Sequence, residues 1–272
     1  MTDRLLDDSD IEAFARDGAI CVRQAFDADW LDLVARGIER NIAEPGPSAR
    51  LYTPDGAPGR FFGDYCNWNR IPEYETFMRQ SPAAQLAAEA MGSPVARIFH
   101  EHVLVKEPGT RERTPWHHDQ PYYCIDGDQI CSIWLSLDRV PRETGVEFAA
   151  GTHASGKMYM PRLFLNHENY DYEPGSYDDV PDIDSRRGEF RILGWDLEPG
   201  DCVIFHARTL HGAPGTEKLQ NRRRGFATRW LGADTTYATR PGETSPPFPE
   251  LKASMKPGDP MDLPIFPVVW SG

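Results

Sequence analysis

The spacing of apolar residues along the chain changes near residue 95. Before that point, apolar residues recur every three or four positions, which is typical of helices that bury one face. The clearest case is the segment 28–43, where Leu31, Val34 and Ile38 share a face. The first third of the chain is therefore predicted to be largely helical.

Two further helices are predicted from their end signals. Residues 9–18 begin with Ser9 and Glu12 at the spacing of a capping box and end at Gly18. Residues 82–91 form a third predicted helix, which Gly92 ends. The other early segments are predicted to be a strand over 19–23 and a long loop, rich in Pro and Gly, over 44–64.

After residue 95, short apolar runs alternate with turns rich in Gly and Pro. This spacing predicts an antiparallel sandwich or barrel. The predicted strands cover 96–106, 115–120, 130–138, 146–149, 201–206, 208–213 and 223–231. The fold class expected is mainly β with flanking helices (α+β).

Two segments lie outside this strand pattern. The insertion 156–190 is acidic and aromatic, and long loops of this kind often cover a binding site. The Pro-rich tail 233–272 ends in an apolar run, so we expect it to dock against the body. The largely helical segment 1–95 has too few core residues to fold alone. We therefore predict one domain over 1–272, with its β core at 96–232.

Composition narrows the function classes. The net charge of −13 argues against broad binding to a nucleic-acid backbone. The five cysteines are scattered, without the spacing of a zinc site or a disulfide framework. The first residues are acidic, unlike a signal peptide, and no apolar run approaches the roughly 20 residues that span a bilayer. We expect a cytoplasmic protein with no membrane or nucleic-acid partner.

A histidine and an aspartate lie two residues apart in the run Thr114–Gln120, which is expected to be extended. In a strand, such residues point to the same side, so His117 and Asp119 are predicted to bind one metal ion. His118 lies between them and is expected to point away. A histidine pair beside an acid also occurs as a hydrogen-bonded surface cluster, and this motif alone does not separate the two.

The 2-His-1-carboxylate arrangement that suits non-haem Fe(II) needs a second histidine. His206 and His211 are the downstream candidates. They lie five residues apart, so in one regular strand they face opposite sides and cannot both be ligands. Gly212 permits a close backbone approach beside His211, which favours His211.

Seven motifs follow one another over most of the chain: Phe14–Gly18, Lys106–Gly109, Pro115–Asp119, Trp134–Asp138, Thr144–His153, His211–Gly212 and Arg223–Trp230. In this order they resemble the phytanoyl-CoA dioxygenase family. The resemblance implies a double-stranded β-helix (jelly-roll, cupin-like) core. It also implies Fe(II) as cofactor, 2-oxoglutarate as co-substrate and O2 as oxidant.

The resemblance also implies roles for individual residues. His117, Asp119 and His211 match the iron ligands. Arg223 matches the arginine that holds the distal carboxylate of 2-oxoglutarate, and a guanidinium suits that group. Lys106 and Trp134 match positions lining the co-substrate pocket, although a tryptophan on a strand is equally typical of a core.

Strand alternation predicts which neighbours of Arg223 point to the same side of the strand. Gly225, Ala227 and Arg229 are expected to share its face, so Arg229 points inward if Arg223 does. Arg222 is expected to be solvated. His153, in a turn where the sequence departs from the family motif, is expected to be structural.

The function that the resemblance implies is a 2-oxoglutarate-dependent dioxygenase that hydroxylates a small molecule and releases succinate and CO2. Asp119 favours hydroxylation, because related halogenases have a small residue there. Two alternatives remain: a cupin-type metal enzyme that does not use 2-oxoglutarate, and a non-catalytic jelly-roll protein that binds a small molecule.

The pocket wall is expected to include Tyr122, Tyr123 and Tyr170. Acidic residues near Tyr170 suit a cationic substrate through ion pairing and cation–π contact, although a solvated acidic loop has the same composition. Arg139 and Arg142, near a strand end, suit an anionic substrate instead. No phosphate-binding motif supports a coenzyme A thioester.

Overall fold

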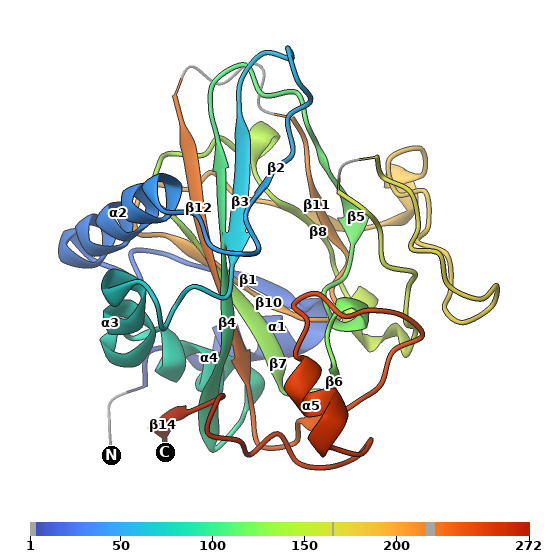
Figure 1. Cartoon of the computed structure of the whole chain (residues 1–272). Helices are drawn as coiled ribbons and strands as arrows, with labels where there is room; N and C mark the ends of the chain where they lie inside the picture. The colour runs from blue at the N-terminus through green and yellow to red at the C-terminus, as the bar shows by residue number, and fades with distance from the viewer. Residues whose placement is uncertain (1–3, 165, 216–220) are drawn as a thin grey trace.

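Two antiparallel sheets face each other in the computed structural model, which describes residues 4–164, 166–215 and 221–272 (Figure 1). The larger sheet has the order β1 (Ala19–Val22), β10 (Cys202–His206), β7 (Ile130–Ser136), β12 (Arg223–Leu231), β4 (Val95–Lys106), β3 (Phe61–Tyr65) and β2 (Arg50–Leu51). The smaller sheet has the order β5 (Thr114–His117), β11 (His211–Ala213), β8 (Glu147–Ala149) and β9 (Ile192–Leu193). The prediction of a mainly β fold is confirmed.

Helices cover the outer face of the larger sheet (Figure 1). They are α1 (Asp8–Asp17), α2 (Ala28–Ala43), α3 (Pro72–Gln80) and α4 (Ala83–Met91). Short 3-10 helices lie in the connections: η1 (Gln120–Tyr122), η2 (Arg142–Thr144), η3 (Thr152–Ser155) and η4 (Arg187–Glu189). The predicted helices over 28–43 and 82–91 are confirmed to within a residue at each end.

Strand β12 shows how the two faces of the larger sheet differ. Phe226 and Trp230 are buried in the cluster between sheet and helices. The ring of Phe226 lies 4.7 Å from that of Tyr74 and 5.4 Å from that of Phe77, centroid to centroid. Arg223 and Arg229 lie on the opposite face and line the cavity between the sheets. The predicted alternation along this strand is confirmed.

The first helix begins differently from its prediction. Its N-cap is Asp7, whose carboxylate accepts from the backbone N–H of Asp10 at 2.8 Å. Ser9 lies inside the helix, and its hydroxyl donates to Asp7. The Ser9–Glu12 capping box is therefore wrong, because a carboxylate two residues earlier caps the same end. Gly18 ends the helix as predicted, in the left-handed conformation with φ 76°.

The predicted loop 44–64 contains regular structure. It holds β2 and most of β3, an edge pair in which Leu51 is opposite Phe62. Helix α3 was not predicted. In the structure Pro72 starts the helix, a position where its missing N–H costs nothing.

The tail lies against the body through two contacts. Strand β14 (Val268–Ser271) pairs with β4, and helix α5 (Pro249–Ser254) buries Leu251 beside Phe266 and Phe99. Residues before α5 also form β13 (Thr236–Tyr237), which pairs with β6 (Ile125–Asp126). Ser245 and Pro246 reach the cavity between the sheets.

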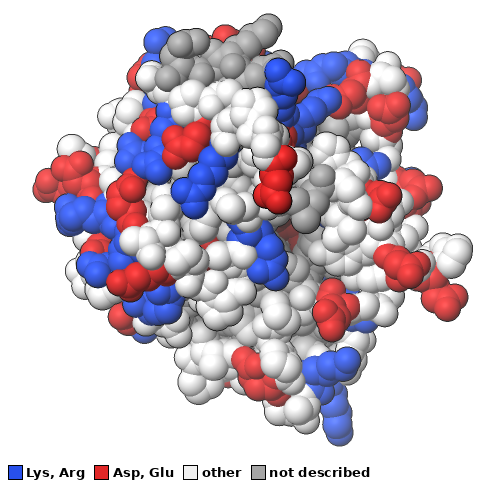
Figure 2. Space-filling model, turned by 45° about the horizontal axis from the view of Figure 1, so that its top comes forward, with Lys and Arg blue, Asp and Glu red and all other residues white. Residues whose placement is uncertain are grey.

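Acidic and basic side chains are interspersed on the face shown in Figure 2, without a continuous basic surface. Across the described ranges, no helix combines the length and the apolar character needed to cross a bilayer.

The packing of α3 on β12 predicts the cost of removing its central ring. Phe226→Ala is expected to lower the free energy of unfolding by about 3–5 kcal/mol, because Phe226 is fully buried against two aromatic rings. Chemical denaturation measures this. Ile265→Ala, at a residue 41% exposed, is the control and is expected to change stability little. Equal effects of the two substitutions would contradict this account of the core.

Candidate active site

Strand pairing in the smaller sheet places two histidines side by side. β5 and β11 are antiparallel, and His117 is the direct partner of His211. Directly opposed residues in an antiparallel pair point to the same face. The two imidazole rings accordingly lie 4.2 Å apart, centroid to centroid.

Asp119 reaches the same point from a turn. Strand β5 ends at His117, and Asp119 has helical backbone angles of φ −75° and ψ −37°. The N–H groups of Asp119 and Gln120 both donate to the carbonyl of Ala207, at 2.8 and 3.0 Å. The predicted strand 115–120 is therefore too long. After His117, the backbone N–H groups bond to the carbonyl of Ala207 and not to a neighbouring strand.

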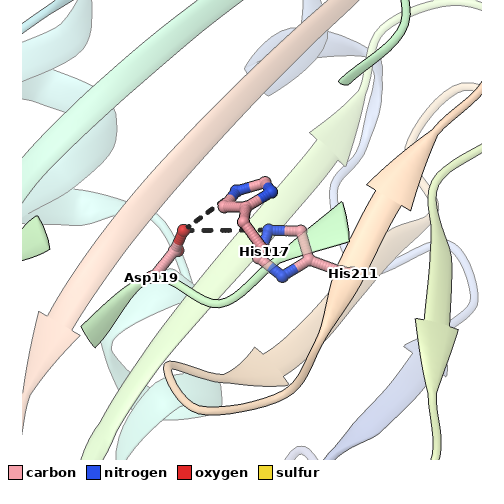
Figure 3. A group of neighbouring side chains, drawn as sticks. All are labelled: His117, Asp119 and His211. Atoms are coloured by element: carbon pink, nitrogen blue, oxygen red, sulfur yellow. Dashed lines mark ion pairs between the residues drawn. The ribbon is translucent and has the colours of Figure 1, made fainter. Parts of the chain in front are cut away.

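The three side chains converge (Figure 3). Oδ1 of Asp119 lies 3.6 Å from Nε2 of His117 and 3.7 Å from Nε2 of His211. One ligand atom from each residue falls within 4.8 Å of the other two, and all three residues are buried. This geometry matches a site for one metal ion on a 2-His-1-carboxylate set.

The second ring nitrogen of each histidine is held by a backbone carbonyl. Nδ1 of His117 lies 2.8 Å from the oxygen of Pro115, and Nδ1 of His211 lies 2.9 Å from that of Thr209. A carbonyl only accepts, so each Nδ1 carries the proton and each Nε2 keeps a free lone pair. This arrangement is typical of metal-binding histidines.

The charge states follow from burial and from neighbouring groups. Burial lowers the pKa of His211 to about 3, which keeps this imidazole neutral. Burial alone would raise the pKa of Asp119. The close approach of His117 and the charge of Arg229 outweigh it and hold that pKa well below its ordinary value. The site presents an ionised carboxylate beside at least one neutral imidazole.

Two groups hold the other oxygen of Asp119. The hydroxyl of Ser132 donates to Oδ2 at 3.1 Å, and Nη2 of Arg229 lies 3.8 Å from it. Arg229 also donates from Nε to the hydroxyl of Tyr123, at 2.9 Å. Oδ2 is therefore occupied by protein groups while Oδ1 faces the histidines.

The remaining histidine candidates lie outside this group. His118 points away, and its Nε2 accepts from the N–H of Tyr159 at 2.8 Å, which ties the insertion to the core. His206 lies on β10, and His211 lies on β11 in the other sheet. The argument that both could not be ligands assumed one regular strand, and that assumption is wrong, because a turn separates the two residues. The preference for His211 rested on Gly212, and His211 is the one that lies beside Asp119.

Of the three consecutive arginines, Arg223 lines the cavity. It is buried, and its Nη1 donates to the carbonyl of Thr144 at 2.5 Å. Burial lowers its pKa to about 10, so it stays cationic at neutral pH. Arg222 pairs with Glu39 and Glu107, and Arg224 pairs with Asp138, outside the cavity.

The other predicted pocket residues take different positions. Trp134 lines the cavity next to Gly225, where a Cβ would meet the indole at 2.6 Å. Lys106 is the cross-strand partner of Arg223, but it is not among the cavity-lining residues. Its Nζ donates to the carbonyl of Glu112 at 2.7 Å, and it lies 4.5 Å from the ring centroid of Phe61.

The three predicted tyrosines all line the cavity. The hydroxyl of Tyr122 donates to the carbonyl of Arg162 at 2.8 Å and accepts from its N–H at 2.6 Å. The ring of Tyr170 meets that of Tyr122 edge-on at 5.5 Å. Tyr122 and Tyr170 thus connect the insertion to the wall beside His117.

The cavity has a volume of about 380 Å³. Sequence reasoning missed much of its lining, which comes from edge strands, the insertion and the tail. The lining residues without a predicted role include Arg50, Tyr52, Phe61, Tyr65, His100, His102, Arg162, Phe164 and Ser245. His100 and His102 could have been found from their spacing. They share one face of β4 with Leu104 and Lys106, because all four occur at every second position.

Two curated proteins with similar sequences carry dioxygenase names. The chain is 25% identical over 156 residues to a probable phytanoyl-CoA dioxygenase of Caenorhabditis elegans, covering 54% of this chain and 46% of the relative. It thus spans about half the length of that relative. It is 20% identical over 250 residues to dioxygenase aneA of Aspergillus aculeatus, covering 84% of this chain and 72% of the relative.

Solved structures share the fold over nearly the whole chain. The carbocyclase SnoK from nogalamycin biosynthesis matches with a TM-score of 0.74 and 18% identity, covering 98% of this chain and 97% of that one. The epimerase SnoN, solved with Fe3+, α-ketoglutarate and nogalamycin RO, matches at 0.72 and 21%, covering 97% and 100%. EctD from S. alaskensis, solved with 2-oxoglutarate and 5-hydroxyectoine, matches at 0.70 and 18%, covering 97% and 88%.

At these identities the structural likeness shows the fold, and it confirms the predicted jelly-roll core. The family follows from the sequence. The model of the phytanoyl-CoA dioxygenase family matches residues 14–225, which include all three converging side chains and Arg223. The resemblance inferred from the motifs is thereby confirmed, and the chain belongs to the phytanoyl-CoA dioxygenase family.

Proposed function

We propose that residues 1–272 form one oxygenase domain that uses Fe(II), 2-oxoglutarate and O2 to hydroxylate a small molecule. The observation that carries this proposal is the convergence of His117, Asp119 and His211 in the same cavity as Arg223. The first three supply a metal site, and the last supplies a buried cation for a dicarboxylate. Family membership supports the same class of enzyme.

The donor atoms fit iron. Two imidazole nitrogens with free lone pairs and one carboxylate oxygen face a common point. This set leaves coordination positions open, which suits non-haem Fe(II) better than a closed structural zinc site. His117, Asp119 and His211 would hold the ion.

Arg223 fits the distal carboxylate of 2-oxoglutarate. Its guanidinium is buried in the cavity, and it has no carboxylate partner among the residues that the structure describes. An unpaired buried cation is costly, so an anionic ligand would stabilise it. Lys106 is the cross-strand partner of Arg223, and Trp134 forms part of the wall. This arginine favours a 2-oxoglutarate enzyme over a cupin-type metal enzyme that does not use that co-substrate.

When bound, iron and 2-oxoglutarate supply oxidation of a substrate C–H bond, with succinate and CO2 as products. The chain's own residues prepare the cavity for this reaction. Aromatic side chains such as Tyr122 and Phe164 line the space beside His117. Asp119 occupies a ligand position that halogenases leave open, which favours hydroxylation.

The ligand assignment predicts a contrast between two histidines. His211→Ala is expected to abolish succinate formation and to weaken Fe(II) binding more than about 100-fold. Loss of a residue that only hydrogen-bonds to a metal ligand typically weakens binding about 10- to 100-fold, and loss of a ligand should cost more. His206→Ala is expected to retain both. Anaerobic titration of Fe(II) measures the affinity, and circular dichroism checks that each variant is folded. Unchanged binding in His211→Ala would refute the assignment.

The co-substrate assignment predicts a contrast between neighbouring arginines. Arg223→Ala is expected to raise the 2-oxoglutarate concentration for half-maximal turnover about 10- to 100-fold, because a charge-assisted contact is lost. Arg222→Ala is the matched control, since Arg222 pairs with Glu39 and Glu107 outside the cavity. Steady-state assays of succinate formation measure both. A larger effect at Arg222 would contradict the assignment.

A further inference from the structure

The cavity is basic although the protein is acidic. Its lining includes the side chains of Arg50, Arg162, Arg223 and Arg229, whereas Asp119 is the one carboxylate among the described lining residues. The whole chain has a net charge of −13. The net charge of the chain therefore does not indicate the sign of the charge inside the cavity.

Two of the four arginines already have a role. Arg223 would bind 2-oxoglutarate under the proposed function. Arg229 is held between Asp119 and Tyr123. Arg50 and Arg162 are left, and both belong to segments at the edge of the cavity, namely β2 and the insertion 156–190.

The backbone of Arg162 is held firmly, while its guanidinium makes few polar contacts. Both backbone polar groups of Arg162 bond to the hydroxyl of Tyr122, which fixes the chain at this point. Its Nε is buried without a hydrogen-bond partner, and Nη2 makes one long contact of 3.5 Å with the carbonyl of Val180. Within the described ranges, no carboxylate forms an ion pair with it.

Arg50 also lines the cavity but, unlike Arg162, it is an exposed residue. Its guanidinium donates to the carbonyl of the adjacent Ala49 at 2.7 Å, and no acidic partner is found among the described residues. Two residues later, Tyr52 brings its ring to 6.2 Å from that of Phe164, centroid to centroid. The segments that carry the two arginines therefore meet through aromatic side chains.

The acidic residues of the insertion do not contribute to this environment. Glu168 and Asp171 are exposed and are not among the cavity-lining residues. From the insertion, the cavity is lined instead by Arg162, Leu163, Phe164, Asn166 and Tyr170. The expectation that an acidic insertion suits a cationic substrate has no counterpart in this lining.

We propose that the substrate is a small molecule with an apolar body and an anionic group, a carboxylate or a phosphate, which Arg162 and Arg50 bind. This inference rests on the proposed function, because it concerns the substrate of the same cavity. The guanidinium of Arg162, with its buried and unpartnered Nε, is suited to recognise such an anion, and the exposed Arg50 adds a second positive charge. Tyr52, Phe61 and Phe164 supply the apolar wall for the body.

The test uses three probes with one carbon skeleton: 4-phenylbutyrate, 4-phenylbutanamide and 4-phenylbutylamine. Each is titrated calorimetrically into the Fe(II)-loaded protein without O2, with and without saturating 2-oxoglutarate. The wild-type protein is expected to prefer the carboxylate over the amide and the amide over the amine. Arg162→Gln is expected to weaken carboxylate binding about 10- to 100-fold and to leave amide binding nearly unchanged.

Arg186→Gln is the matched control, because Arg186 lies in the same insertion, is exposed and pairs with Glu189. It is expected to bind all three probes as the wild type does. Equal affinity for the probes, preference for the amine, or no binding of any probe would overturn the inference. Binding of 2-oxoglutarate is measured separately and does not depend on Arg162, so its failure would count against the proposed function alone.

Discussion

The site depends on the pairing of two short strands and on the turn that ends one of them. Antiparallel pairing of β5 with β11 sets His117 opposite His211 without any contribution from side-chain chemistry. Residues two apart in a continuous strand are separated by about 6.6 Å along it. The helical turn at Asp119, anchored on the carbonyl of Ala207, instead folds the carboxylate back toward both imidazoles.

The buried carboxylate of Asp119 needs further polar partners to be stable. An ionised carboxylate buried at Asp119 costs several kcal/mol unless it is paired. Ser132 and Arg229 satisfy one of its oxygens, and Tyr123 in turn holds Arg229. The other oxygen and the two Nε2 atoms present lone pairs to one another, which is unfavourable in the absence of a cation. Protein groups thus bind one oxygen of Asp119, and the other oxygen is free to bind a metal ion.

Local pattern predicted the long elements because they rest on short-range regularity, whereas the ligand set depended on the resemblance to a family. Helix 28–43 has a clear apolar face, and the alternation on β12 identified the inward side of Arg223 and Arg229. Prediction failed where a distant group decides the conformation. Strand β5 ends early because Ala207, almost ninety residues later, accepts from Asp119. The separation of His206 from His211 depends on two sheets that no local spacing specifies.

The lining of the cavity was hardest to predict for a related reason. Its outer region comes from β2, the insertion and the tail near Ser245, segments without periodic apolar residues. A cavity wall needs neither periodicity nor high hydrophobicity, so these segments had no signal of their own. Lys106 is the opposite case. The family motif predicted that it lines the pocket, but its Nζ donates to the backbone carbonyl of Glu112, which does not line the cavity.

The contrast between an acidic chain and a basic cavity follows from the range of electrostatic forces. Charges on the exposed surface are screened over about 8–10 Å at ordinary ionic strength, whereas buried charges such as Arg223 are screened much less. A bound molecule is therefore governed by the few cations that line its path, not by net charge. The two sheets carry the metal ligands and Arg223, while Arg50 and Arg162 lie on an edge strand and an insertion. Substitutions in those outer segments leave the sheet register intact, so substrate preference can change there without altering the chemistry.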